Sequence, residues 1–397
     1  MAILDLLFSI IYKKKYLGLL QDIFEKNELV DHKDPSPPYY LKAEDLFVQN
    51  YGKEIFIKKL YSISKTIQKR GTVILAPGIA TNGNIYRVTI DGELLTLDHN
   101  KSFANFLAAE GFTVYIYNPG YTERIYNRYV SKYCSQSIYF NRRYSPPSDL
   151  NFTELVDLEL PMLINFVEED SGDENLSWIG YSLGCMLMYS YLSRQSDDRI
   201  KNIVSIGSPI SLNQMFIKIV PFANALSKAL GFEETALLGA LSENIVPLTR
   251  LIRILPSSLI QYNPFSFIFF NPRNMFTNTV KALLGKIIEP IPSGLEQCFS
   301  NIIHYGFTSK LNYTNYLVDL RRLRKINKNF LFFLGESDTF ASPDSVCLAH
   351  EIISPNNTKN LLSIPSTGHL DLIIGKNAFE KVWLPSIKWL KEVSNIN

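Results

Sequence analysis

The sequence predicts an α/β protein whose strands form a doubly wound, mostly parallel sheet, with a helical region inserted late in the chain. The first observation is that short apolar segments alternate with helical segments, which is typical of parallel sheets covered by helices. The second is that this alternation stops between residues 209 and 327, in a long apolar stretch. The third is composition: 46% hydrophobic and 20% charged residues indicate a globular chain, and 397 residues suffice for a large core.

The expected elements follow one another in chain order. Two strands joined by the turn Asn50-Tyr51-Gly52 are predicted over residues 44–61. Further strands are expected at residues 72–75, 112–117, 176–180, 200–206, 330–334 and 360–364. Helices are expected at residues 102–110, 153–169, 183–192 and 379–393.

Four regions make up the expected domain organisation. Residues 1–42 are expected to hold a helix and a proline-rich linker, 43–208 and 328–397 the two parts of the α/β core, and 209–327 a helical cap over the site. The first helix is expected to pack on the body of the protein. The alternative is contact with a lipid surface, because Phe8 and Ile10 precede three consecutive lysines. We recognise no signal peptide and no membrane-spanning run, so a cytoplasmic protein is expected, with membrane association as the alternative.

Charge and cysteine usage argue against several classes of partner. The net charge is +2 and the basic residues are scattered, so no nucleic-acid partner is expected. The four cysteines form no CxxC pair, and we expect neither a metal site nor a cofactor. Their sparse, irregular spacing suits a reducing compartment better than a disulfide scaffold.

Residues 180–184, Gly-Tyr-Ser-Leu-Gly, are the strongest local signal for chemistry. They follow an apolar strand and open a helix, which is the context in which a G-x-S-x-G serine becomes a nucleophile. A tight strand-to-helix turn lifts the hydroxyl of Ser182 above the sheet and directs backbone N–H groups at the reacting oxygen. The alternative interpretation is an ordinary glycine-lined turn.

A serine nucleophile needs an adjacent base, and of the five histidines only His369 lies in a loop after the last expected strand. Gly368 lets that loop turn, and a closing helix follows. We interpret His304 as structural, because it lies in the inserted region before the acid. The remaining histidines are expected to be bystanders, namely His32, His99 and His350.

The acid of such a site is expected just after the strand at residues 330–334. Asp338 is the preferred candidate, with Glu336 as its rival and Asp344 as a second rival that more naturally serves as an early-helix charge. The acid would fix the imidazole tautomer and stabilise the imidazolium. Backbone N–H groups of Ile79 and Leu183 are the expected oxyanion donors, because one follows the third strand and the other follows the nucleophile.

At these residues the chain resembles a known family. Residues 44–389 resemble the acid-lipase branch of the α/β hydrolases, the gastric and lysosomal lipases, and a bacterial group near the polyhydroxyalkanoate synthases. The most specific match is residues 368–375 (GHLDLIIG), similar to the His-Leu-Asp stretch of acid lipases, and residues 75–84 (LAPGIATNGN) resemble the oxyanion strand and loop. The resemblance implies the α/β-hydrolase fold and a Ser182–Asp338–His369 triad. Pro77 stands where the family usually has histidine, and residues 120–146 lack its Arg-Gly.

Three functions are compatible with this pattern. We expect a hydrolase of carboxylic esters, acting on a lipid or another apolar acyl ester, because the inserted region is rich in aromatic residues. An acyltransferase with the same triad and an acceptor other than water is the first alternative. A non-catalytic binding protein on the same fold is the second.

Overall fold

The computed structural model describes residues 41–50, 53–89, 102–122, 124–126, 129–130, 138–139, 142–144, 149–210, 257–262, 266–305, 318–355 and 357–394. The expected N-terminal helix and linker lie outside the described residues, as does most of the first half of the expected cap, residues 211–256.

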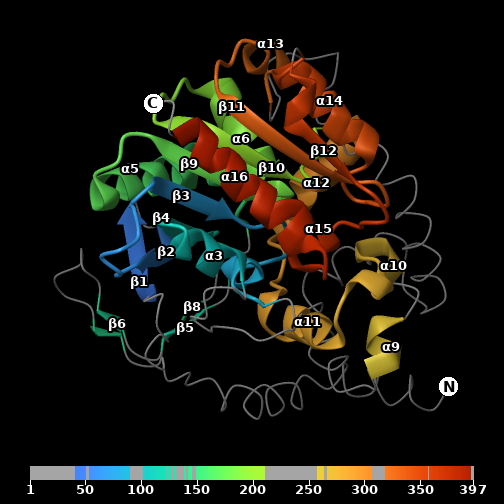
Figure 1. Ribbon diagram of the computed structural model, residues 1–397, viewed down its shortest axis with the longest axis horizontal. Helices are drawn as coiled ribbons and strands as arrows, with labels where there is room; N and C mark the ends of the chain where they lie inside the picture. The colour runs from blue at the N-terminus through green and yellow to red at the C-terminus, as the bar shows by residue number, and fades with distance from the viewer. Residues whose placement is uncertain are drawn as a thin grey trace.

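An eight-stranded sheet forms the centre of the molecule, in the order β1-β2-β4-β3-β9-β10-β11-β12 (Figure 1). β1 pairs with β2, and β2 with β4, in antiparallel fashion, and every other neighbouring pair in this sheet is parallel. The strands are β1 Leu41–Asn50, β2 Lys53–Ser62, β3 Gly71–Ala76, β4 Phe112–Asn118, β9 Leu176–Tyr181, β10 Ile200–Ile206, β11 Asn329–Gly335 and β12 Leu361–Ile364. The mostly parallel, doubly wound sheet predicted from the sequence is therefore confirmed.

The burial of each strand explains its sequence pattern. β9 is buried at every residue, and β3 and β10 at nearly every one, because helices cover both of their faces. These strands accordingly consist of near-continuous apolar runs. β2, near the sheet edge, buries Ile55, Ile57 and Leu60 while the residues between them are only partly buried.

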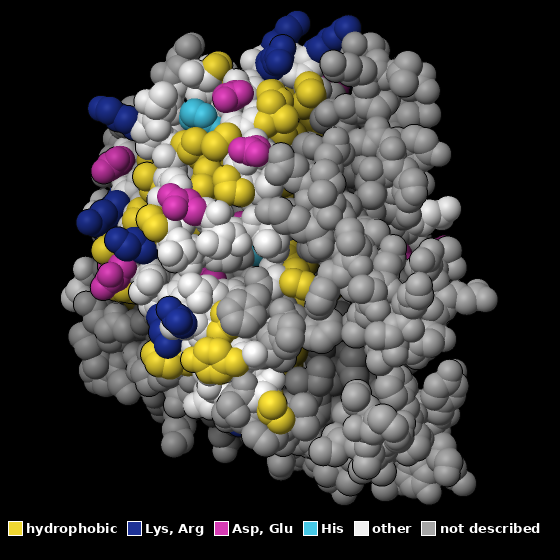
Figure 2. Space-filling model, turned by 90° about the vertical axis from the view of Figure 1, so that its right-hand side faces the viewer, with side chains coloured by type: hydrophobic (Ala, Val, Ile, Leu, Met, Phe, Trp, Pro, Cys, Tyr) yellow, Lys and Arg dark blue, Asp and Glu magenta, His cyan; other side chains and the backbone are white. Residues whose placement is uncertain are grey.

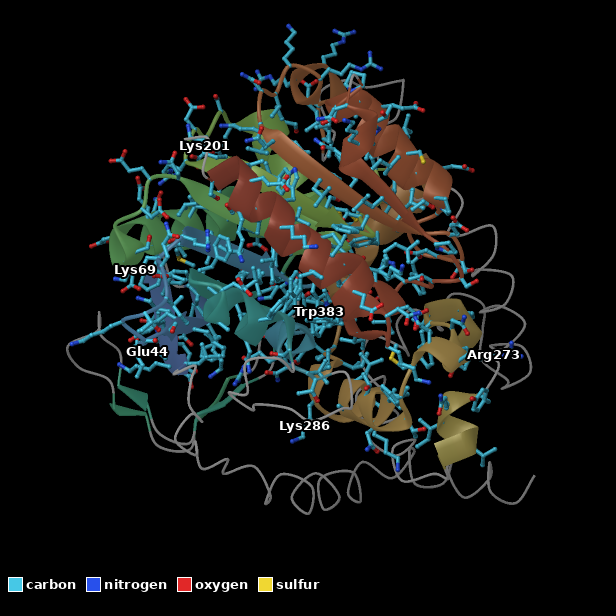
Figure 3. The ribbon with its side chains drawn as sticks, in the orientation of Figure 1. Glu44, Lys69, Lys201, Arg273, Lys286 and Trp383 are labelled. Atoms are coloured by element: carbon cyan, nitrogen blue, oxygen red, sulfur yellow. The ribbon has the colours of Figure 1, made fainter. Side chains whose placement is uncertain are left out.

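Helices cover both faces of the sheet (Figure 1). One face packs against α5 Leu160–Ser171, α6 Leu183–Arg194 and α14 Pro343–Ile353. The other packs against α3 Phe103–Ala109, α15 Asp371–Ile374, the π-helical turn η6 Phe379–Trp383 and α16 Leu384–Ser394. Trp383, labelled in Figure 3, stacks on the ring of Phe103 with 5.5 Å between centroids, which joins the last helical region to α3.

The helix expected at residues 153–169 is observed as one run of helical turns from Phe152 to Ser171. It comprises α4 Phe152–Glu154, the π-helical turn η2 Leu155–Glu159 and α5. Asn151 and Glu154 form a reciprocal capping box at its start. Pro161 lacks an N–H, so the preceding turn cannot keep the regular α-helical bonding, and Leu160 N–H bonds instead to the Leu155 carbonyl.

The described part of the inserted region consists of short helices and helical turns. Those within residues 257–287 lie at the lower right of Figure 1, beyond the carboxyl end of β11, whereas the last one, at residues 320–323, lies at the opposite end of that strand. These elements are α9 Ser257–Gln261, α10 Ser266–Phe269, η3 Pro272–Asn274, α11 Thr277–Ala282, η4 Leu283–Ile287, α12 Ser293–Tyr305 and α13 Leu320–Leu323. A 3₁₀ turn, η5 Thr358–Asn360, precedes β12.

Two short strand pairs that the sequence did not predict lie between residues 124 and 144. β5 Arg124–Tyr126 pairs with β8 Arg142–Tyr144, and β6 Tyr129–Val130 pairs with β7 Ile138–Tyr139. No helix among the described residues is both long enough and apolar enough to cross a membrane. On the face shown in Figure 2, charged side chains of both signs are interspersed with apolar ones over the described surface.

Candidate active site

Ser182 occupies a sharp turn between β9 and α6. Its backbone angles are φ 51° and ψ −117°, a conformation that non-glycine residues rarely adopt. The flanking glycines make this turn possible, because a Cβ on Gly180 would lie 2.5 Å from the Cys185 nitrogen and one on Gly184 would lie 2.1 Å from the Ala76 oxygen. Ser182 is therefore held at the carboxyl end of a central strand, at the N-terminus of a twelve-residue helix.

His369 lies beside this serine. It follows β12, and its Nε2 is 2.9 Å from Ser182 Oγ. The rings of Tyr181 and Phe340 pack against the imidazole, with centroids 5.0 Å and 5.4 Å away. These two aromatic contacts restrict the orientation of a side chain that is already almost fully buried.

Asp338 completes the chain of hydrogen bonds. It follows β11, and its Oδ2 is 2.7 Å from His369 Nδ1. Its other oxygen accepts bonds from the backbone N–H groups of Phe340 and Ala341, both at 2.8 Å, which fixes the carboxylate. Because a carboxylate only accepts, the imidazole proton is assigned to Nδ1, and the Nε2 lone pair then faces the serine hydroxyl.

The rival acids lie elsewhere. Glu336 is exposed and accepts a bond from the Ser363 hydroxyl at 2.9 Å. Asp344 is exposed in the first turn of α14. The structure brings Ser182, His369 and Asp338 together and leaves both rivals outside this chain of bonds.

The other candidate histidines do not join the site within the described residues. His350 Nε2 is 2.9 Å from the Asn357 carbonyl oxygen, and the ring edge packs on Phe332. His304 falls in α12, but its side chain lies outside the described residues, as do His32 and His99 entirely. Cys185 is not a rival nucleophile, because burial raises the pKa of its thiol to about 12.

The two expected oxyanion donors lie on either side of the serine. Leu183 is the first residue of α6, so its N–H is one of the orphan donors of a helix N-terminus. Ile79 follows β3 in a loop whose Gly78 approaches Ser182 so closely that an added Cβ would be 3.2 Å from Ser182 Cβ. Within the described part of the chain, the Ile79 N–H donates no hydrogen bond.

The inserted region contacts the loop that carries His369. Leu370 N–H bonds to the Phe269 carbonyl at 2.9 Å, and the Asn271 side chain bonds to the Ser366 carbonyl at 3.0 Å. Phe269 also packs on Phe340, the same ring that contacts His369. Figure 3 labels two residues of this inserted segment, Arg273 and Lys286.

Asp371 is a residue to which the sequence reasoning gave no role. Its Oδ2 accepts backbone bonds from Gly368 and from Asn271, both at 2.7 Å, so it ties the base loop to the insertion. Burial raises the pKa of this carboxyl to about 6, although the two backbone donors act in the opposite direction. The available signal was its spacing of three residues from Gly368, which suits a local side-chain-to-backbone bond.

No group of three or more His, Cys, Asp or Glu residues in the described part of the chain is arranged to hold a metal ion.

Part of the sequence matches a known protein family. Residues 71–230 match the family model for the α/β-hydrolase fold. No curated protein matches the sequence significantly.

Among solved structures, a candidate lipase from Sulfolobus solfataricus is similar with a TM-score of 0.51 and 17% identity, over 92% of this chain and 98% of that one. A thermophilic esterase from Thermogutta terrifontis has a TM-score of 0.48 and 14% identity, over 89% and 99% of the two chains. The chain therefore has the α/β-hydrolase fold.

Proposed function

We propose that this protein is a serine hydrolase that cleaves carboxylic esters with an apolar acyl group, through an acyl-enzyme on Ser182. The observation that carries the proposal is the continuous chain of hydrogen bonds from Ser182 through His369 to Asp338, at 2.9 Å and 2.7 Å. A serine hydroxyl is a weak nucleophile near neutral pH, and an adjacent base held by a carboxylate is the arrangement that activates it.

The first half of the reaction acylates the enzyme. Ser182 Oγ attacks the ester carbonyl while its proton passes to His369 Nε2, and the carbonyl oxygen becomes an oxyanion facing the N–H groups of Ile79 and Leu183. The tetrahedral intermediate collapses, the bond to the alcohol oxygen breaks, and Nε2 returns the proton to that oxygen. Asp338 stabilises the imidazolium during both transfers.

The second half releases the acid. A water molecule attacks the acyl carbon and gives its proton to His369 Nε2. The second intermediate collapses, the bond between the acyl carbon and Ser182 Oγ breaks, Oγ recovers the proton from Nε2, and the carboxylic acid leaves.

The apolar surroundings of the imidazole support an apolar acyl group. Phe340 contacts the His369 ring, and Phe269 from the inserted region packs on Phe340. The resemblance of residues 368–375 to acid lipases agrees with a lipid-like ester. These features leave the acceptor open, so transfer to an alcohol is an outcome that the assay must be able to register.

The test measures hydrolysis of p-nitrophenyl esters of short and medium acyl chains. Ser182→Ala and His369→Ala should each lower kcat by about 10⁴-fold or more, because triad members act as a unit. Asp338→Asn should cause an equal or smaller loss, whereas the matched control Glu336→Gln should retain wild-type activity. An inactive Glu336→Gln beside a fully active Asp338→Asn would contradict the assignment of the acid. Product analysis with added alcohol would reveal ester formation if the enzyme is an acyltransferase.

A further inference from the structure

The peptide unit between Gly78 and Ile79 is held from one side by two buried hydroxyl groups. The Thr81 hydroxyl donates to the Gly78 carbonyl at 2.9 Å, and the Tyr121 hydroxyl donates to the same oxygen at 3.1 Å. Both side chains are buried, and Tyr121 is fully so. A carbonyl oxygen has two lone pairs, so both acceptor positions of Gly78 are occupied.

The geometry of a peptide bond carries this constraint to the next residue. In a trans peptide the C=O and the N–H point in opposite directions within one rigid plane. Two bonds on the Gly78 oxygen therefore direct the Ile79 N–H away from Thr81 and Tyr121. Hydrogen bonds to the carbonyl also polarise the N–H of the same unit, which strengthens it as a donor.

Ser182 lies close to Gly78. A Cβ on Gly78 would lie 3.0 Å from the Tyr181 ring and 3.2 Å from Ser182 Cβ. The loop then turns at Ala80, whose φ of 55° is unusual for a residue with a side chain. Gly78 is thus bonded to a buried hydroxyl pair through its carbonyl and lies beside Ser182.

We infer that Thr81 and Tyr121 are positioning residues, which act through the Gly78 carbonyl to aim the Ile79 N–H at the oxyanion. The inference rests on the proposed function. It extends that function to two residues that do not touch the substrate and that come from different elements: Thr81 from the loop after β3, and Tyr121 from the loop after β4.

The backbone of the loop has other supports, which makes the hydroxyl groups testable by themselves. Thr81 forms a β-bridge with Ile288 of the inserted region. Asn82 N–H bonds to the Ile287 carbonyl at 3.0 Å, and Glu289 N–H bonds to the Ala80 carbonyl at 2.9 Å. Removing one hydroxyl should therefore free the peptide to rotate without detaching the loop.

The experiment compares Thr81→Val, Tyr121→Phe and the double variant with wild type on a p-nitrophenyl ester. Each single variant should lower kcat by about tenfold and leave KM within about twofold, since a misdirected donor loses part of the 10²- to 10³-fold effect of a missing one. Thr81→Ser, which keeps the hydroxyl, should recover most of the activity. The Ki of a long-chain trifluoromethyl ketone, whose serine adduct carries an oxyanion, should rise by the same factor as kcat falls.

The matched control is Tyr191→Phe, which also removes a buried phenol hydroxyl, one that donates to Asp197 at 2.6 Å. It should lower the urea midpoint and leave kcat and Ki unchanged. The inference is overturned if Ser182→Ala is inactive but Thr81→Val and Tyr121→Phe keep the kcat and Ki of wild type. It is also overturned if kcat falls in these variants without a change in Ki. An active Ser182→Ala would instead remove the proposed function, and the inference with it.

Discussion

Asp371 should make the stability of this protein depend on pH in a way that one substitution removes. Its carboxyl is 1% exposed, and burial raises its pKa from 3.8 to about 6. The folded state therefore holds this proton more tightly than the unfolded state does. The stabilising contribution of the protonated form is fully present below pH 3.8 and is lost as the pH rises through about 6.

The size of the effect follows from that shift. A difference of roughly two pKa units corresponds to about 3 kcal/mol over the whole window, of which about 2 kcal/mol falls between pH 4.5 and 7.5. Asp371→Asn has no proton to lose, and its amide oxygen can still accept from Gly368 and Asn271. From pH 4.5 to pH 7.5, the free energy of unfolding of Asp371→Asn should therefore rise by about 2 kcal/mol relative to that of wild type.

Urea unfolding of wild type and Asp371→Asn at both pH values measures this gain. Contributions of other titrating groups are shared by the two proteins and cancel in the difference. Asp371→Ala also has no proton to lose, but it leaves the Gly368 and Asn271 N–H groups without their acceptor, so it should be less stable than Asp371→Asn by about 3 kcal/mol at both pH values. If the difference in free energy of unfolding between wild type and Asp371→Asn is the same at pH 4.5 and 7.5, the raised pKa of Asp371 is refuted.

Three further outcomes follow from the packing. The fully buried Arg87 has no hydrogen-bond partner for its guanidinium among the described residues, and burial lowers its pKa to about 10. Arg87→Met should therefore raise the free energy of unfolding in urea by about 1–3 kcal/mol, and a lower free energy of unfolding would contradict this. Cys185 should escape iodoacetamide in native protein and react in urea, as peptide mapping would show. Gly184→Ala should lose activity and solubility, because its new Cβ would meet the Ala76 oxygen at 2.1 Å. Gly172→Ala should lower the free energy of unfolding by only about 1 kcal/mol, because the space around Gly172 is open and only its φ of 68° is unfavourable for alanine.

The sequence predicted those parts of the site whose signals are local. Ser182 stands in a five-residue motif between an apolar strand and a helix, and His369 and Asp338 each follow a recognisable strand. The carboxyl ends of parallel strands meet at one edge of the sheet, so chain order alone was enough to bring these three together.

Two supporting contacts could not be predicted because the partners are distant in sequence. The bond from Tyr121 to the Gly78 oxygen spans 43 residues, and the bond between Asp371 and Asn271 spans 100 residues. Nothing in the local pattern of either segment specifies such a contact. The short strand pairs within residues 124–144 were missed for a different reason, since the segments of two or three residues are too short to show a period.

The nucleophilic role of Ser182 is the central claim, and labelling with a fluorophosphonate probe followed by peptide mapping tests it most directly. The probe reacts covalently with a serine that a neighbouring base has activated. The account predicts that wild-type protein carries the label on the peptide containing Ser182, and that Ser182→Ala carries none. A wild-type protein that stays unlabelled, or one that carries the label on another serine, would contradict it.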